Sequence, residues 1–290
     1  MGIPRTNYYR WMRAASKPEA SGPMERAARA IASPTPEEVA AVKEQALLYP
    51  RLGYKRLAWQ MLDQGAAALR PGQVYAALGQ LELIVRRPKE ISQALKRPAP
   101  PTRSDDVWHI DLMYVCLSDR WYYLVDIVDG FSRFLVHWSL NTTMLAQTVT
   151  LTVQEAVERL LPKPAKAPTL IHDHGSQFVS AEWRSLIKSS GITDVKTRVA
   201  HPQSNGIVER LHRTHREEAL LDKDASYHEA LEHFAQWVQY YNRERPHSAL
   251  RYLCPIDYYR GDPEARLAER RIKLAEAQEA RAAYWRASQL

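Results

Sequence analysis

Three carboxylates in this 290-residue sequence stand where an acidic side chain is costly. Asp111 lies in the middle of the strand-like stretch VWHIDLMYV, Asp173 ends the stretch TLIHD, and Glu209 lies in the first turn of an expected helix. An unpaired charge in an apolar element costs free energy, and three neighbouring carboxylates raise one another's pKa unless a cation lies between them. Oxygen ligands without Cys or clustered His favour Mg²⁺ or Mn²⁺. Two such ions could activate a nucleophile and stabilise the leaving oxygen of a phosphodiester.

Short apolar stretches from residue 106 onward predict the elements that position these carboxylates. VWHIDLMYV, WYYLVDIVDG and FSRFLVHWSL are typical of strands, and the DG turn between the last two predicts a three-stranded meander. The next segments alternate between helical and strand-like patterns and end in two helices, IVERLHRTHREEALL and YHEALEHFAQWVQYYN. Antiparallel strands followed by alternating helices and strands predict a mixed α/β domain over residues 105–262.

A smaller all-α domain is predicted before it. TPEEVAAVKEQALLYP begins with Thr, Pro and two Glu, a good helix start, and ends at a proline. Two further short amphipathic stretches give residues 36–97 the outline of a helix-turn-helix, although any small bundle of three helices also fits. We expect a basic arm over residues 1–35, a proline-rich linker over 98–104, and one C-terminal helix over 263–290.

Composition and charge restrict the classes of function. The sequence has no apolar run of eighteen residues, and its basic, aromatic beginning does not resemble a secretory signal, so we expect a cytoplasmic protein. Two cysteines are too few for a disulfide framework. The net charge is +7, and the excess lies in residues 1–110, which hold 17 Lys and Arg against 10 Asp and Glu. This distribution suggests attraction to a phosphate backbone, although a solvated basic surface fits as well.

Other acids compete for the role of metal ligand. Asp129 belongs to the sequence DGFS, a turn signature, and is expected to cap the hairpin. Asp126 lies in the same strand and could be near the site. Asp129 is therefore not assigned to the metal site, whereas the residues alone leave Asp126 open.

Four histidines are weighed in the same way. His172 and His174 flank Asp173 and would point to the opposite face if the strand continues, so packing or an indirect role is favoured for them. His212 and His215 share a helical face, but without a nearby Cys or His pair a zinc site is disfavoured.

Five sequence blocks resemble the bacterial insertion-sequence transposases related to retroviral integrases. They are WHIDLMYV, DGFSRFLVHW, HDHGSQF, HPQSNGIVERLHRTHREE and YYNRERPHSAL, and the resemblance extends over residues 5–270. It implies an RNase H-like catalytic core in which Asp111, Asp173 and Glu209 form an acidic (DDE) triad. It also implies two Mg²⁺ ions per active site, for which Mn²⁺ can substitute.

The resemblance implies DNA contacts as well. Basic residues at the positions of Arg213 and Arg216, and the residue at the position of Asn205, touch the transposon end in this family. From the residues alone, Arg213 and Arg216 fall on the helical face of Glu209, but Glu–Arg pairing on an exposed helix gives the same pattern. The further predicted DNA contacts are Arg243, Arg245 and His247 in NRERPHSAL, and Arg51, Lys55 and Arg56 in the helical domain.

These features predict a metal-dependent DNA transposase that cuts at transposon ends and joins the freed 3′-hydroxyl to another phosphodiester. The expected partners are double-stranded DNA (ends and target), at least one further copy of the chain, and an upstream helix-turn-helix protein of the same element. We expect it to associate with the nucleoid. The alternatives are an RNase H-like nuclease that cuts without joining and a non-catalytic DNA-binding protein derived from a transposase.

The sequence departs from the family pattern at three places. Met113 stands where relatives usually have Thr or Ser, and His172 where Ser or Thr is common; neither position supplies a metal ligand. The expected recognition helix PGQVYAALGQLEL has Ala76, Ala77 and Gly79 where relatives tend to be basic. Side chains able to read bases are therefore sparse in this helix.

Overall fold

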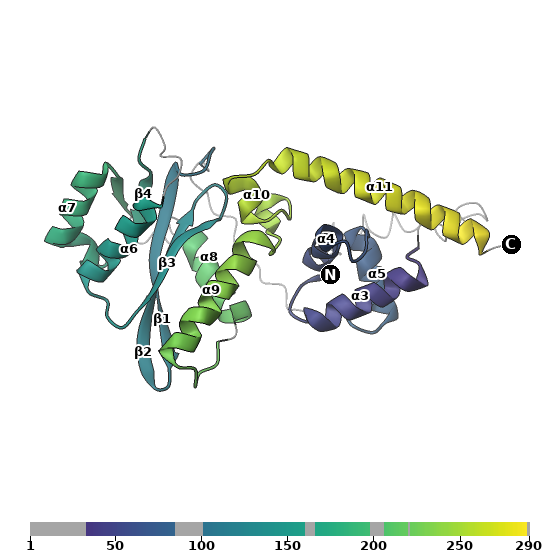
Figure 1. The fold of residues 1–290 in the computed structure, drawn as a ribbon, viewed down its shortest axis with the longest axis horizontal. Helices are drawn as coiled ribbons and strands as arrows, with labels where there is room; N and C mark the ends of the chain where they lie inside the picture. The colour runs from purple at the N-terminus through teal and green to yellow at the C-terminus, as the bar shows by residue number, and fades with distance from the viewer. Residues whose placement is uncertain (1–32, 85–100, 160–165, 198–205, 220, 289–290) are drawn as a thin grey trace, which may run out of the picture.

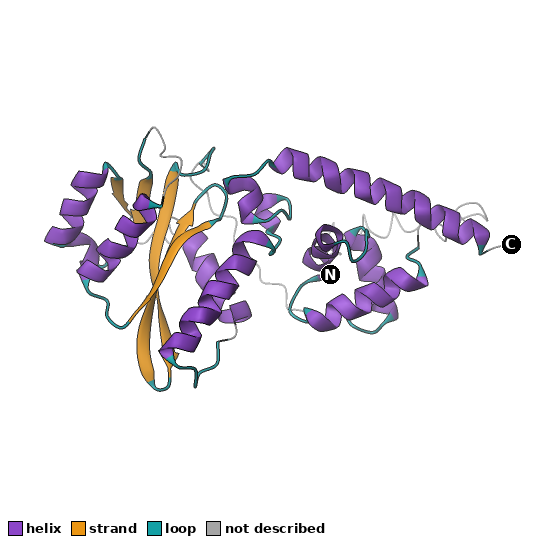
Figure 2. Cartoon of the chain, viewed as in Figure 1, coloured by secondary structure: helices purple, strands orange, loops and turns teal. Residues whose placement is uncertain are grey.

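The computed structural model describes residues 33–84, 101–159, 166–197, 206–219 and 221–288. Short helices come first along the chain, a mixed α/β domain follows, and one long helix ends it (Figures 1 and 2).

One five-stranded sheet forms the centre of the α/β domain, with the strand order β3-β2-β1-β4-β5. β1 pairs antiparallel with β2, β2 pairs antiparallel with β3, and β4 and β5 run parallel to β1 and to each other. This is the predicted meander followed by a parallel addition, an RNase H-like arrangement. The strands are β1 (Val107–Leu117), β2 (Arg120–Asp129), β3 (Leu135–Asn141), β4 (Thr169–His172) and β5 (Thr193–Lys196).

Helices cover both faces of this sheet (Figure 1). Successive side chains of a strand point to opposite faces, and β1 follows this rule closely. Trp108 and Ile110 pack with α6 (Ala146–Glu158) and α7 (Ala181–Ser190). Met113, Val115 and Leu117 pack with α8 (Gly206–Thr214) and α9 (Tyr227–Arg243). Asp111 has the parity of the second set, so it faces α8.

Local signals explain where several of these elements start and end. Ser180 accepts a hydrogen bond from the backbone of Trp183 at the start of α7, and Gly191 ends the helix with φ +71°. Asp129 closes the β2–β3 turn by accepting hydrogen bonds from the backbone and hydroxyl of Ser132. This confirms the capping role predicted for Asp129.

The expected continuous helix through residues 207–221 is interrupted. α8 ends at Thr214 and continues as a π-helical turn, His215–Ala219. Such turns are rare and occur frequently at functional sites.

The N-terminal helices pack around a core of their own. α3 (Pro36–Leu48), α4 (Tyr54–Gln64) and α5 (Pro71–Gln80) enclose Val42, Leu57, Met61 and Val74. Thr35 and Glu38 form the capping box predicted at the start of α3.

After α10 (Pro255–Tyr259), the helix α11 (Pro263–Ala287) confirms the single C-terminal helix that was predicted and passes along the N-terminal helices (Figure 1). Arg270 Nε donates to Asp63 Oδ1 at 2.9 Å, and Arg281 Nη1 donates to Glu38 Oε1 at 2.6 Å. These ion pairs join α11 to α4 and α3.

Within the described ranges, no helix is both long enough and apolar enough to span a membrane.

Candidate active site

Asp111 lies on the sheet face that α8 covers, in the middle of a regular strand. Its side chain is 21% exposed, and Oδ1 accepts a hydrogen bond from the backbone N–H of Leu112 at 3.0 Å. β1 pairs with β2 from Trp108 to Leu117 and with β4 from Val107 to His109. The backbone that carries this carboxylate is therefore held in the interior of the sheet.

Asp173 directly follows the last residue of β4, on the neighbouring strand. The parallel register joins Val107 to Thr169 and His109 to Ile171, and continuing it by two residues places Asp173 beside Asp111. Asp173 is exposed, and its Oδ1 accepts the backbone N–H of Gly175 at 2.9 Å. The exposed carboxylate therefore lies just beyond the carboxyl end of an interior strand of the sheet.

Glu209 comes to the same region from the helix layer. Val208 and Leu211 are buried against the sheet, which leaves Glu209 exposed in the first turn of α8. Burial raises the pKa of Asp111, the charge of His212 and the Leu112 N–H oppose this, and the negative charges of Asp173 and Glu209 raise the pKa further. The three carboxylates thus share one electrostatic environment.

The donor set determines which group could bind here. Three carboxylates supply only hard oxygen ligands, which suit Mg²⁺ or Mn²⁺, and a divalent cation would relieve the repulsion that raises the pKa of Asp111. Among the described residues, no three His, Cys, Asp or Glu side chains are already gathered tightly enough to enclose a metal ion. The chemistry of the donor set fits a divalent cation.

Beside Asp111, on the neighbouring strand β2, lies a buried acid to which the sequence analysis gave no role. Asp126 pairs directly with Asp111 across β1 and β2 and is fully buried. Its Oδ2 lies 3.3 Å from His212 Nε2 and 3.1 Å from His215 Nε2, and His212 Nδ1 lies 3.6 Å from Asp111 Oδ2. Burial alone would raise the pKa of Asp126, but the two histidines outweigh it and lower the pKa to about 2. Asp126 is therefore an ionised carboxylate in the core, next to Asp111 of the candidate site.

His172 has the packing role that was favoured for it. The side chain is fully buried, its ring stacks on Phe178 at 4.1 Å between centroids, and its Nε2 lies 2.7 Å from Asp194 Oδ1. His174 is exposed.

The helix that carries Glu209 also carries two predicted DNA contacts. Arg213 Nε donates to Glu217 Oε1 at 2.7 Å, so this arginine has the structural partner that the DNA-contact prediction discounted. Both side chains are largely exposed, at 41% and 52%, and such pairs add little stability. Arg216 is exposed on the π-helical turn. Of the two, Arg216 is the better placed for a phosphate.

The structure gives different surroundings to the three residues of NRERPHSAL that were predicted to contact DNA. Arg245 is 2% exposed, and its guanidinium donates two hydrogen bonds to Glu218, at 2.6 and 2.7 Å. His247 Nε2 lies 3.1 Å from Arg245 Nη1, and burial lowers its pKa well below the ordinary value. Arg245 is therefore a buried structural residue, whereas His247 beside it is partly exposed. Arg243 is exposed, with Nε donating to Gln239.

Two of the three predicted contacts in the helical domain have partners within the chain. Arg56 Nη1 donates to Glu218 Oε1 at 3.0 Å, and Arg51 Nη1 donates to the carbonyl of Glu217 at 2.6 Å. These arginines join α4 and the residues before it to the π-helical turn. Lys55 remains exposed. Asn205 lies outside the described residues.

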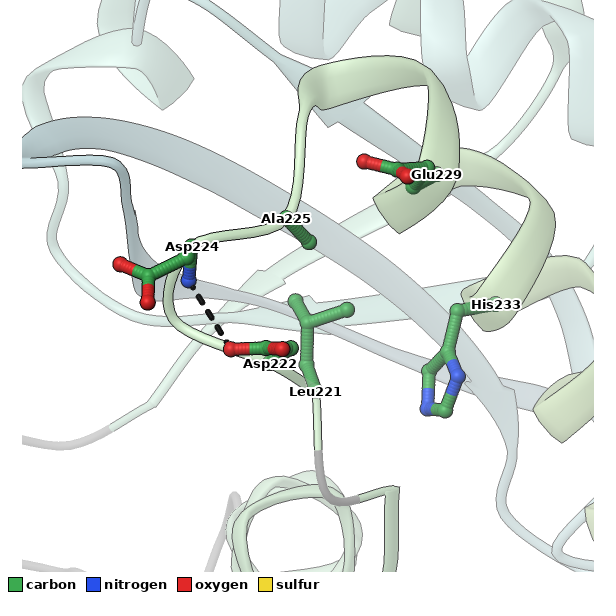
Figure 3. Close-up of a pocket in the computed structure, with 6 residues that line it drawn as sticks. All are labelled: Leu221, Asp222, Asp224, Ala225, Glu229 and His233. Atoms are coloured by element: carbon green, nitrogen blue, oxygen red, sulfur yellow. Dashed lines mark hydrogen bonds between the residues drawn. The ribbon is translucent and has the colours of Figure 1, made fainter.

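A separate cavity is lined by none of the three candidate carboxylates (Figure 3). It measures about 260 Å³ and lies between the turn that follows the π-helical residues and the start of α9. Two of its acids have local partners: Asp222 accepts the backbone N–H of Asp224, and Glu229 completes a capping box with Ser226. Its lining residues are Leu221, Asp222, Asp224, Ala225, Glu229 and His233.

Comparison with known proteins identifies the α/β domain. The integrase core domain family matches this chain over residues 101–202, and a second integrase core domain family matches residues 190–255. All three carboxylates lie within these ranges.

Two insertion-sequence proteins show how far the similarity extends. The transposase for insertion sequence element IS904 of Lactococcus lactis subsp. lactis is 30% identical over 175 residues, covering 59% of this chain and 66% of the relative. A putative transposase, InsK, for insertion sequence element IS150 of Escherichia coli is 24% identical over 269 residues, covering 88% of this chain and 89% of the relative. Among solved structures, the catalytic core domain of BIV integrase aligns with 56% of this chain and 99% of its own, at 20% identity and a TM-score of 0.43.

Proposed function

We propose that this chain, which belongs to the insertion-sequence transposases of the integrase superfamily, cleaves DNA at the ends of its element and joins the freed 3′-hydroxyl to another phosphodiester. The observation that carries the proposal is the shared environment of Asp111, Asp173 and Glu209 within the integrase core domain. The substrates are double-stranded transposon ends and a target duplex.

Asp111, Asp173 and Glu209 are the residues that would hold Mg²⁺, or Mn²⁺ in its place, as two ions per active site. When bound, these ions supply a nucleophile at neutral pH and stabilise the charge on the leaving oxygen of the phosphodiester. The chain contributes the placement of the ligands. β1 fixes Asp111, the Gly175 N–H orients Asp173, and the exposed first turn of α8 presents Glu209.

The proposed reaction has two balanced steps. In the first, a water oxygen forms a bond to phosphorus at the end of the element and the bond from phosphorus to the 3′-oxygen breaks; the water loses a proton to solvent, and the released 3′-oxygen takes up a proton to become a hydroxyl. In the second, that hydroxyl loses its proton to solvent, its oxygen forms a bond to a target phosphorus, and the neighbouring 3′-oxygen of the target strand is displaced and takes up a proton. The number of phosphodiester bonds is unchanged in the second step, so no external energy source is required.

Basic and polar side chains around α8 would guide the DNA. We assign phosphate contacts to Arg216 and Lys55, which are exposed, and to Arg213, which would exchange Glu217 for a phosphate. Arg243 and Asn205 remain proposed contacts. Joining two ends to one target requires two active sites, so we propose at least a dimer on DNA. An upstream helix-turn-helix protein of the same element remains a proposed partner, because α5 exposes Ala76 and Gly79 where base-reading side chains are expected.

The experiment uses labelled terminal DNA of the element, a supercoiled target plasmid and Mg²⁺. Wild-type protein is expected to release a 3′-hydroxyl strand and to transfer label to the plasmid. Glu209→Gln is expected to lose both products while still binding the labelled DNA. Glu217→Gln, eight residues along and exposed, is the matched control and should retain both. Cleavage without transfer would identify a nuclease, and wild-type binding with neither product would identify a non-catalytic protein.

A further inference from the structure

A cluster of three buried polar side chains lies beside Asp111, one of the proposed metal ligands. Asp126 is fully buried, and His212 and His215 are 5% and 2% exposed. Neither oxygen of Asp126 has a partner in full hydrogen-bond geometry among the described residues, and the two imidazoles lie 3.3 and 3.1 Å from its Oδ2. Burying a polar group without a full hydrogen bond costs free energy. A cluster that lowers stability in this way is expected to have a role beyond packing.

The two histidines differ in what they reach. His212 contacts both carboxylates, with Nε2 3.3 Å from Asp126 Oδ2 and Nδ1 3.6 Å from Asp111 Oδ2. Of the two carboxylates, His215 contacts only Asp126, and its ring packs on Trp237 of α9 with 4.0 Å between centroids. His215 secures the buried carboxylate to the helix layer, whereas His212 connects that carboxylate to the active site.

The position of His212 in the sequence adds a second link. His212 lies three residues after Glu209 on α8, so the imidazole and Glu209 belong to one rigid helix. Asp126 and Asp111 are opposite each other on two paired strands. The imidazole therefore bridges the helix that presents Glu209 and the strand that presents Asp111.

We infer that His212 is a positioning residue, which orients the Asp111 carboxylate and sets the separation of α8 from β1, using Asp126 as its buried anchor. This inference rests on the proposed function, because it concerns how the proposed ligands are placed. Residues behind a metal site that orient its ligands commonly change metal affinity by about 10- to 100-fold when they are substituted.

The test measures Mn²⁺ affinity by electron paramagnetic resonance, which requires neither DNA nor turnover. His212→Phe keeps a ring of similar shape and removes the contact with Asp111, and is expected to weaken Mn²⁺ binding by about 10-fold or more. His215→Phe is the matched control, because it also removes an ion pair with Asp126 but none with Asp111. His215→Phe should leave Mn²⁺ affinity within about twofold. Both variants are expected to lower the melting temperature. Equal losses of affinity in both variants, or no loss in either, would overturn the inference.

Two further variants complete the experiment. Asp126→Asn keeps the shape of the side chain and removes the charge that anchors His212, so it should weaken Mn²⁺ binding even if His212→Phe does not fold. Unchanged affinity in Asp126→Asn would count against the anchor. Asp111→Asn tests the proposed function separately: if it leaves Mn²⁺ binding unchanged, the metal site itself is wrongly placed, whatever the histidine variants show.

Discussion

Asp111 and Asp126 are directly opposite each other on β1 and β2, yet their surroundings give them opposite properties. Asp111 is partly exposed, and burial together with the charges of Asp173 and Glu209 raises its pKa. Asp126 is fully buried, and the two histidines hold its pKa at about 2. Two acids that are opposite each other on paired strands thus differ: Asp111 is accessible to a cation, and Asp126 is buried and ionised at neutral pH.

Arg216 is expected to contact DNA phosphate. Arg216→Ala should reduce the slope of log affinity against log salt by about 0.7 to 0.9 for any end sequence, because one phosphate contact is lost. Its melting temperature should equal that of the wild type, since the side chain is exposed. Arg271→Ala, an exposed arginine on α11, is the control and should change neither quantity. A lowered melting temperature with an unchanged slope in Arg216→Ala would show a structural role instead.

Glu218 is expected to stabilise the fold, since it neutralises Arg245 and binds Arg56 across the two domains. Glu218→Gln should lower the free energy of unfolding by about 3–5 kcal/mol at pH 7, because the Arg245 guanidinium then remains buried without a counter-charge. Glu217→Gln, beside it but largely exposed, should cost less than about 1 kcal/mol. Denaturant titrations of both variants measure the difference, and equal effects would contradict the role of Glu218.

The same residue predicts a dependence on pH. Burial would raise the pKa of Glu218, but hydrogen bonds and charges from Arg245 and Arg56 outweigh it and lower the pKa. A lowered folded pKa gives stability that is complete above the unfolded value, about 4.3, and is lost as the pH falls through the folded pKa. The gap in unfolding free energy between wild type and Glu218→Gln should therefore be constant from pH 7 to 5 and narrow below about pH 4.3. A gap that widens on acidification would reverse the sign of this account.

The long helix α11 binds the N-terminal helices of its own chain and is expected to stabilise them. Asp63→Asn should cost about 3–5 kcal/mol of unfolding free energy, because Arg270 is 3% exposed and loses its partner charge. Arg271→Ala, beside it but exposed, should change stability by less than about 0.5 kcal/mol. Limited proteolysis should also cut α3–α5 faster in Asp63→Asn. An unchanged cutting rate and stability would contradict the stabilising role of α11.

Local patterns were sufficient to predict the three-stranded meander, the mixed α/β domain and the cap at Asp129, because alternation and turn chemistry are encoded by neighbouring residues. The place of Asp126 required the register of the β1–β2 hairpin. Its two-residue turn, Ser118 and Asp119, adopts positive φ at both positions, yet it lacks the Asn-Gly or Asp-Gly signal that would have shown this. Without that register, Asp126 could not be set against Asp111.

The partner of Arg56 and Arg245 could not be predicted from the sequence for a different reason. Their shared partner Glu218 is 162 and 27 residues away in the sequence, so only the folded chain shows that their charges are neutralised. A basic residue in a basic segment looks the same whether it binds phosphate or a buried glutamate. The π-helical turn that brings Glu218 to both arginines was equally hidden, because its sequence continues the pattern of an ordinary helix.

The central claim is that Asp111, Asp173 and Glu209 bind metal together, and iron-directed cleavage of the protein tests it most directly. Fe²⁺ takes the place of Mg²⁺, and with ascorbate and peroxide it produces radicals that cut the backbone beside the bound ion. We predict cuts near residues 111, 173 and 209, all suppressed by excess Mg²⁺ and all lost together in Asp111→Asn. Cuts near only one of these residues, or cuts elsewhere that Mg²⁺ suppresses, would contradict the claim of a single site.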